Sequence, residues 1–229
     1  MTTAQQRLHH ALDALDTAGR SSQPGPPVHA CEHCWSDRDF ALLAGPATLL
    51  PNGLLHSAAA KTPASWDDFP TLYRRLAPRI LRQLTTGRLA VDGPLIASRL
   101  LAADWREWPH AGQVADVLDA WWSAALDRPA PTPDVPEVLE TVATATGTLA
   151  PWLHTWANTP TRTADRHLAD TVEGWLRWGE LPGLTFGFYQ ELQVGAELTK
   201  WLLALPPGRI GPDRRYWLEL INLPATADS

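Results

Sequence analysis

The chain has 229 residues, 45% of them hydrophobic and 19% charged, and it carries a formal net charge of −6 at pH 7. This length and composition are typical of a globular domain with a real core, and they exclude collagen-like and intrinsically disordered chains. An acidic chain lacks the basic surface that nonspecific nucleic-acid binding requires. Because no stretch approaches the roughly 20 apolar residues of a membrane span, we expect neither a nucleic-acid nor a membrane partner.

The first sixteen residues contain charged side chains that interrupt any apolar run, so they lack the pattern of a secretory signal. Cys31 and Cys34 are the two cysteines, and their separation is too short to staple a chain of this size. We therefore expect a protein of the reducing cytoplasm.

Helical periodicity begins at residues 3–18, where leucines recur at helical spacing and Gly19 supplies a stop. Turn-forming residues at 20–28 predict a linker, so residues 1–28 form a helix and its tether. Ser36 is placed to cap a short helix that ends near Leu43, and Asp39 imitates the acidic partner of a capping box.

The strongest helical pattern covers residues 70–86, with Leu76 and Ile80 on an apolar side and several arginines on another. Pro78 lies inside this segment, so we expect it to kink the helix or to split it in two. Asp68 is in position to cap the helix ahead of Pro70.

Further helices are predicted at residues 92–103, 109–126, 136–146, 149–158, 161–178, 188–204 and 212–221. The prolines at 127–136 predict an internal joint, residues 223–229 are expected to form a frayed tail, and no segment has convincing strand alternation. The predicted fold class is all-α: an irregular multi-helix array, α-solenoid-like or an orthogonal bundle, with about nine helices in a single domain at 29–222. The residues expected in its core include Leu76, Ile80, Val114, Leu118, Trp121, Leu168, Val172 and Trp175.

Four motifs lie within this predicted array: C-E-H-C at 31–34, D-D-F at 67–69, W-R-E-W-P at 105–109 and A-W-W at 120–122. Together they resemble a family of uncharacterised bacterial all-helical proteins, over the middle third of the chain. The resemblance implies one ordered unit from residue 29 onward. It transfers no catalytic residue to this chain.

The densest group of soft metal ligands is formed by His29, Cys31, His33 and Cys34. Two thiolates at C-x-x-C spacing can occupy adjacent corners of a tetrahedral Zn(II) site, but a structural site needs four ligands and no second C-x-x-C exists. The two histidines of this segment, or a more distant one, would complete it. The hypothesis is a structural Zn(II); the alternatives are a reactive dithiol or ordinary buried thiols.

Arg74, Arg75, Arg79 and Arg82 share one face of the helix predicted at 70–86, and that helix contains no acidic residue. Guanidinium groups bind carboxylate and phosphate bidentately, so Arg75, Arg79 and Arg82 form a candidate anion-binding site. The alternative is that these arginines pair with acidic residues elsewhere in the chain or face water.

Three tryptophan pairs have helical spacing: Trp105/Trp108, Trp152/Trp156 and Trp175/Trp178. Each pair is expected to pack in the core or, alternatively, to form an aromatic cage for a ligand. The acidic pair at 67–68 lacks the third acid of a terpene-synthase motif. The E-x-x-H spacing at 107–110 lacks the second copy that a di-iron bundle needs.

No complete catalytic constellation can be assembled from this sequence. Whether the protein is an enzyme therefore stays open, and the sequence favours a non-enzymatic role. The expected function is a non-enzymatic helical interaction or scaffold module whose partner is another protein. The alternative is a small-molecule-binding protein or enzyme with a Trp-lined cavity and the arginine helix as its anion site. A deep pocket into which Arg75, Arg79 or Arg82 pointed would favour the alternative.

The zinc hypothesis leads to a first prediction. Protein purified without added metal is expected to contain about one equivalent of zinc, because a structural site binds its metal as the chain folds. Elemental analysis measures this content. Less than about a tenth of an equivalent, with both thiols freely titratable, would exclude a structural zinc site.

Overall fold

The computed structural model describes residues 2–19, 27–30, 33–177 and 181–222. Helix accounts for 71% of the structure and strand for 3%, which confirms the all-α prediction. The described residues form eleven α-helices rather than about nine. They are α1 (Thr3–Ala18), α2 (Asp37–Ala44), α3 (Asn52–Ala60), α4 (Phe69–Thr85), α5 (Gly93–Ala102), α6 (Ala111–Asp127), α7 (Val135–Thr146), α8 (Ala150–Ala157), α9 (Arg162–Arg177), α10 (Gly195–Ala204) and α11 (Pro212–Ile221).

Local capping chemistry sets several helix starts where the sequence predicts them. The Ser36 side chain accepts the Asp39 N–H and the Asp39 carboxylate accepts the Ser36 N–H, which completes the predicted capping box of α2. Asp68 Oδ1 accepts the Thr71 N–H at 3.1 Å and caps α4. These bonds satisfy N–H groups that a helix leaves open in its first turn.

Helix α4 is one helix and not two, although Pro78 lies in its middle. Leu76 and Ile80, on either side of the proline, are both buried. Burial of apolar side chains before and after Pro78 keeps the helix continuous and outweighs the backbone hydrogen bond that proline removes.

The helix predicted at 188–204 is wrong in its first half. A two-stranded antiparallel hairpin is present instead, β1 (Thr185–Phe186) and β2 (Leu192–Gln193), and helix begins only at Gly195. Gly187 and Gln190 have positive φ angles of 97° and 60°, which turn the chain back on itself. At Gly195, a Cβ atom would collide with the Leu181 carbonyl oxygen, so the packing requires glycine there.

The sequence analysis also missed a short helix, α3, and five 3₁₀ turns. The 3₁₀ turns are η1 (Ala47–Leu49), η2 (Pro63–Ser65), η3 (Trp105–Glu107), η4 (Leu181–Gly183) and η5 (Pro207–Arg209). Helix α3 is rich in alanine and has no acidic residue in its first turn and no side-chain cap. It therefore lacks the capping signals that predict the starts of α2 and α4.

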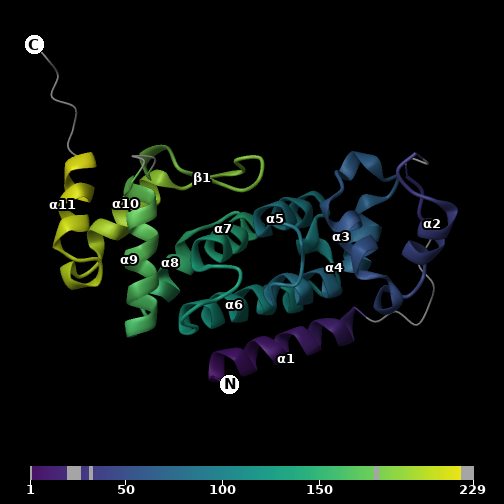
Figure 1. The fold of residues 1–229 in the computed structure, drawn as a ribbon, viewed down its shortest axis with the longest axis horizontal. Coiled ribbons are helices and arrows are strands. Elements are labelled where there is room, and N and C mark those ends of the chain that lie inside the picture. The colour runs from purple at the N-terminus through teal and green to yellow at the C-terminus, as the bar shows by residue number, and fades with distance from the viewer. Residues whose placement is uncertain (1, 20–26, 31–32, 178–180, 223–229) are drawn as a thin grey trace, which may run out of the picture.

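The helices form an elongated array (Figure 1). Helix α6 lies near its centre and packs on α1, α4, α7, α8 and α9. Helices α5 and α7 pack on each other, and the β1–β2 hairpin lies along α7. Helices α2 and α3 lie at one end of the array, and α9, α10 and α11 lie at the other (Figure 1).

One continuous apolar core runs through this array and includes α1. Seven of the eight residues predicted to be buried are buried, and Trp175 is the exception, since it stays partly exposed in the last turn of α9. Four buried indoles, Trp105, Trp108, Trp122 and Trp156, donate their N–H groups to backbone carbonyls at 2.8–3.1 Å. Burial of an indole with its N–H satisfied indicates packing rather than a ligand cage. Trp178 lies outside the described residues.

No helix in the described part of the chain is long and apolar enough to span a bilayer.

Replacement of a buried tryptophan should be costly. Trp156 is fully buried and its ring contacts both Trp122 and Trp201. We expect Trp156→Ala to lower the free energy of unfolding by about 3–5 kcal/mol through loss of apolar contacts and creation of a cavity. Urea denaturation followed by circular dichroism measures it. Trp217→Ala is the control: Trp217 is 54% exposed, and an equal loss in both variants would contradict this account.

Candidate functional site

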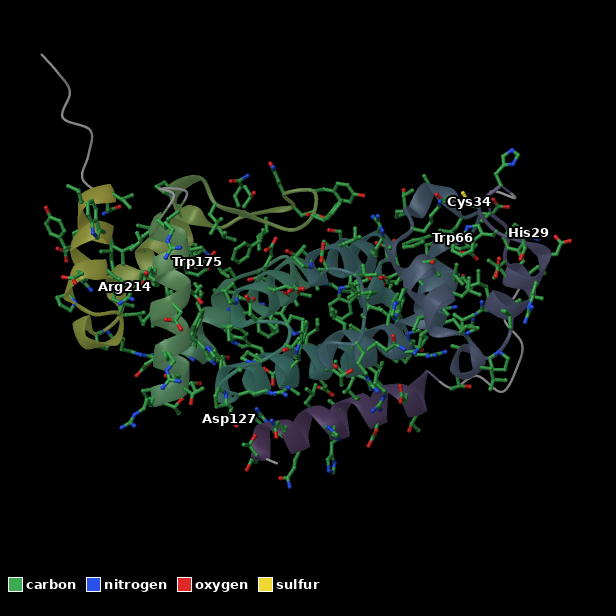
Figure 2. The ribbon with its side chains drawn as sticks, in the orientation of Figure 1. His29, Cys34, Trp66, Asp127, Trp175 and Arg214 are labelled. Carbon is green, nitrogen blue, oxygen red and sulfur yellow. The ribbon has the colours of Figure 1, made fainter. Side chains whose placement is uncertain are left out.

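Two of the predicted metal ligands, His29 and Cys34, lie at the end of the molecule that holds α2 and α3. Figure 2 shows His29, Cys34 and Trp66 there, far from Trp175 and Arg214 at the other end. Cys31 lies outside the described residues. Cys34 is exposed, and its Sγ accepts a hydrogen bond from Lys61 Nζ at 3.2 Å.

His29 and His33 are both exposed. Within residues 2–19, 27–30, 33–177 and 181–222, no group of three or more His, Cys, Asp or Glu side chains is arranged to hold a metal ion. The described ligands therefore do not form a closed site by themselves. The zinc hypothesis stays a prediction that rests on Cys31.

The chain beside His29 is fixed by backbone pairing. Asp67 N–H donates to the His29 carbonyl oxygen at 3.2 Å, and Ala30 and Trp66 form an isolated antiparallel bridge. The Trp66 ring lies 5.0 Å from the ring of Trp35, centroid to centroid. Two hollows flank this pairing, an enclosed one of about 150 Å³ and a more open one of about 570 Å³.

The arginines of α4 are held by the chain itself. Arg75 donates from Nη1 to the Ala44 carbonyl at 3.3 Å and from Nη2 to the Leu43 carbonyl, at the C-terminus of α2. Arg79 donates to the carbonyls of Ala47 and Leu50 and to Asn52 Oδ1. Two of the three arginines predicted to bind an anion therefore bind carbonyl oxygens at the end of a helix or turn. Burial lowers the pKa of both guanidinium groups.

Arg82 binds two carboxylates on α1. Its Nε donates to Asp16 Oδ2 at 2.8 Å and its Nη2 donates to Asp13 Oδ1 at 2.7 Å. The hydrogen bond from Arg82 holds the pKa of Asp13 below its ordinary value. Arg82 thus pairs with acidic residues of another helix, as the alternative interpretation expected, and Arg74 is exposed.

Arg75, Arg79 and Arg82 line a hollow of about 300 Å³ beside Gly19 and Pro78. Their contacts point the guanidinium groups toward oxygens of the protein. The buried Nε of Arg75 is the polar atom of this group with no hydrogen-bond partner. The hollow therefore lies between α1, α4 and the turn after α2. The guanidinium groups that line it already bind oxygens of the protein.

A different arginine, which the sequence analysis missed, is the most buried cation of the described chain. Arg99 on α5 is 4% exposed. Its Nη1 donates to the Tyr189 hydroxyl at 3.1 Å, its Nη2 donates to the Ala60 carbonyl at 3.3 Å, and its Nε is buried without a partner. The sequence holds one signal for it: Arg99 lies on the apolar stripe of its helix, between Ile96 and Leu100.

A second missed feature is the outer face of α11. Tyr216, Trp217 and Leu220 are 61%, 54% and 42% exposed, at spacings that place them on adjoining parts of the helix surface. Leu218 is the buried residue of this helix. Arg214 ties α11 to α9 through Glu173 at 2.6 Å, and an open hollow lies between the two helices, with Leu176 and Trp217 in its wall.

No protein-family model, no curated protein and no solved structure matches this chain. The resemblance to uncharacterised bacterial all-helical proteins therefore stays a hypothesis that rests on four short motifs.

The pairing of Arg82 with α1 can be tested through pKa values. In Arg82→Gln, the pKa of Asp13 should rise toward its ordinary value because the main hydrogen bond that lowers it is lost. Side-chain carboxyl NMR titration measures this. Asp39 is the control, because Ser36 lowers its pKa instead and no change is expected there.

The same pair makes stability depend on pH in a defined direction. Since the folded-state pKa of Asp13 is depressed, its stabilising contribution is present above the ordinary pKa and is lost as the pH falls through the folded-state pKa. Arg82→Gln should lack that part of the acid-induced loss. Equal acid sensitivity of the variant and the wild type would contradict the pairing.

Proposed function

We propose that this protein is a non-enzymatic helical interaction module that binds another protein through the outer face of α11. The observation that supports the proposal is the exposed group Tyr216, Trp217 and Leu220, which we call the α11 face. Folded proteins rarely leave large adjoining apolar side chains in water without a binding role. Tyrosine and tryptophan are also the residues that most often dominate the energy of protein interfaces.

The mounting of α11 supports this role. The helix is held to α9 by the Arg214–Glu173 pair, and Arg215 Nη1 donates to the Leu205 carbonyl at 3.2 Å. These contacts, together with the burial of Leu218, fix the helix on the array. The α11 face is therefore presented on a rigid element, which lowers the ordering cost of binding.

The charges around this face favour a partner of mixed polarity. Arg177 and Glu173 lie on one side of it, and Arg215 pairs with Glu219 on its own helix at 2.8 Å. A surface of alternating sign does not select a highly charged polymer. We therefore propose a protein partner with an apolar groove whose rim carries both signs.

A structural zinc at Cys31 and Cys34 stays part of this proposal, as a staple for the α2–α3 end of the array. It would lie at the end opposite the α11 face and would not take part in binding.

The alternative, a ligand-binding protein that uses the arginine helix, has weaker support. Its candidate ligands Arg75, Arg79 and Arg82 are bound to oxygens of the chain. A ligand in the hollow that these arginines line would have to displace those internal hydrogen bonds. The carbonyls at the helix end would then lose their donors.

The proposal predicts that binding depends on α11. We expect one protein of the native cell extract to be retained by the wild-type chain and by Leu49→Ser, and to be lost with the double variant Trp217→Ala/Leu220→Ala. Leu49 is the matched control because it is 74% exposed at the other end of the array. Affinity isolation with quantitative mass spectrometry measures retention, and the isolated protein is then titrated against purified chain.

Two outcomes would contradict the proposal. Retention of the same proteins by all three chains would show that α11 does not mediate binding. Light scattering that shows a dimer of the purified wild type, dissociated by the double variant, would assign the α11 face to self-association instead.

A further inference from the structure

The environment of Arg99 is unusual for a charged side chain. The residue is 4% exposed. Of the three guanidinium nitrogens, one faces a hydroxyl, one faces a carbonyl and one has no partner. No carboxylate of the described residues forms an ion pair with it. Arginine is almost never this buried unless it is paired, because removal of an unpaired charge from water is expensive.

The nearby acids of the hairpin are committed elsewhere. Glu140 on α7 accepts the Gly187 N–H at 2.9 Å, and Glu191 accepts the Tyr189 N–H at 2.9 Å. These bonds shape the hairpin turn, and neither carboxylate forms an ion pair with Arg99. The guanidinium charge of Arg99 therefore has no ion-pair partner among the described residues.

A second buried polar group, on helix α4, which packs on α5, also lacks a partner. The Tyr73 hydroxyl on α4 is buried and makes no hydrogen bond. Burial raises the pKa of Tyr73 and the charge of Arg99 partly offsets that rise, so the phenol stays neutral and can donate. Two unsatisfied donors, Arg99 Nε and Tyr73 Oη, thus lie in the same interior region. Both are donors that an oxyanion would satisfy.

An exposed side chain lies over Arg99. Tyr189 places its hydroxyl on Arg99 Nη1, and its ring lies over the guanidinium with 5.6 Å between ring centroid and Cζ. Yet Tyr189 itself is 58% exposed, at the turn of a hairpin of two residue pairs. A ribbon of this length is marginally stable by itself, so the turn can move aside at low cost while Phe186, which is buried, anchors its base.

We propose that Arg99 and Tyr73 form a binding site for a small monocarboxylate, and that Tyr189 covers the site when it is empty. A carboxylate would replace the Tyr189 hydroxyl on the guanidinium and accept a hydrogen bond from Tyr73. A monoanion fits because it neutralises one buried arginine, whereas a phosphate dianion would leave a buried negative charge. This site is separate from the α11 face and does not depend on its role.

Acetate and benzoate are the probes. The purified full-length chain is titrated with each sodium salt against sodium chloride at constant ionic strength, and the Nε–H resonance of Arg99 is followed by NMR. That resonance is assigned by its loss in Arg99→Gln. We expect saturable shifts with the carboxylates and none with chloride.

Two conservative variants separate a binding site from a structural contact. Tyr189→Phe removes the hydroxyl that competes for Arg99, so carboxylate should bind about fivefold more tightly. Tyr73→Phe removes a donor, so binding should weaken by about the same factor. Tyr216→Phe changes another exposed tyrosine on α11 and should bind as the wild type does.

The proposal fails if acetate and benzoate act no differently from chloride, or if Tyr189→Phe binds no more tightly than Tyr216→Phe. Stronger binding of phosphate at pH 8 than of either carboxylate would overturn the assigned ligand class. If Arg99 only joined α5 to α3 and the hairpin, Arg99→Gln would lose stability while the wild type showed no carboxylate response, which also overturns the proposal.

Discussion

Burial of the apolar side of α6 is the constraint on which the rest of the structure depends. Val114, Val117, Leu118, Trp121 and Trp122 are all buried, and the helices that cover them come from both halves of the chain. Helix α1 covers one side although many residues separate it from α6 in sequence. A helix with so wide an apolar surface cannot be satisfied by one neighbour, so several helices assemble around it.

Hydrogen bonds from long polar side chains then join helix ends that the core does not reach. Arg75 binds the last carbonyls of α2, and Arg209 binds the carbonyls of Trp156 and Ala157 at the end of α8. A guanidinium suits this task because it has several donors in a fixed plane and keeps its charge when partly buried. Arg75, Arg79, Arg82 and Arg209 therefore hold the helices together. For this reason the arginine face of α4 is not an open anion site.

Arg99 differs from these arginines in one physical respect. Arg75 binds carbonyls at a helix end, which supply partial negative charge, and Arg209 binds such carbonyls and also the Asp165 carboxylate. Arg99 has one carbonyl and one neutral hydroxyl, and its Nε has neither. The two functional proposals thus rest on opposite anomalies: apolar side chains that water surrounds on α11, and a charged side chain that water does not reach on α5.

The sequence by itself determined the helical class and many helix ends, because these depend on neighbours within a few residues. The Ser36–Asp39 capping box and the Asp68 cap could be predicted for that reason. The sequence also indicated two interpretations of the α4 arginines: an anion-binding site, or pairing within the chain. It could not distinguish between them. Asp13 and the carbonyls of Leu43 and Ala44 reach those arginines only after α1 and α2 have packed. The packing of the hairpin on α7, the burial of Arg99 and the exposure of the α11 face were likewise decided by tertiary structure, since each depends on how segments distant in the chain are arranged. Periodicity shows which side of a helix is apolar, but not whether another helix covers it.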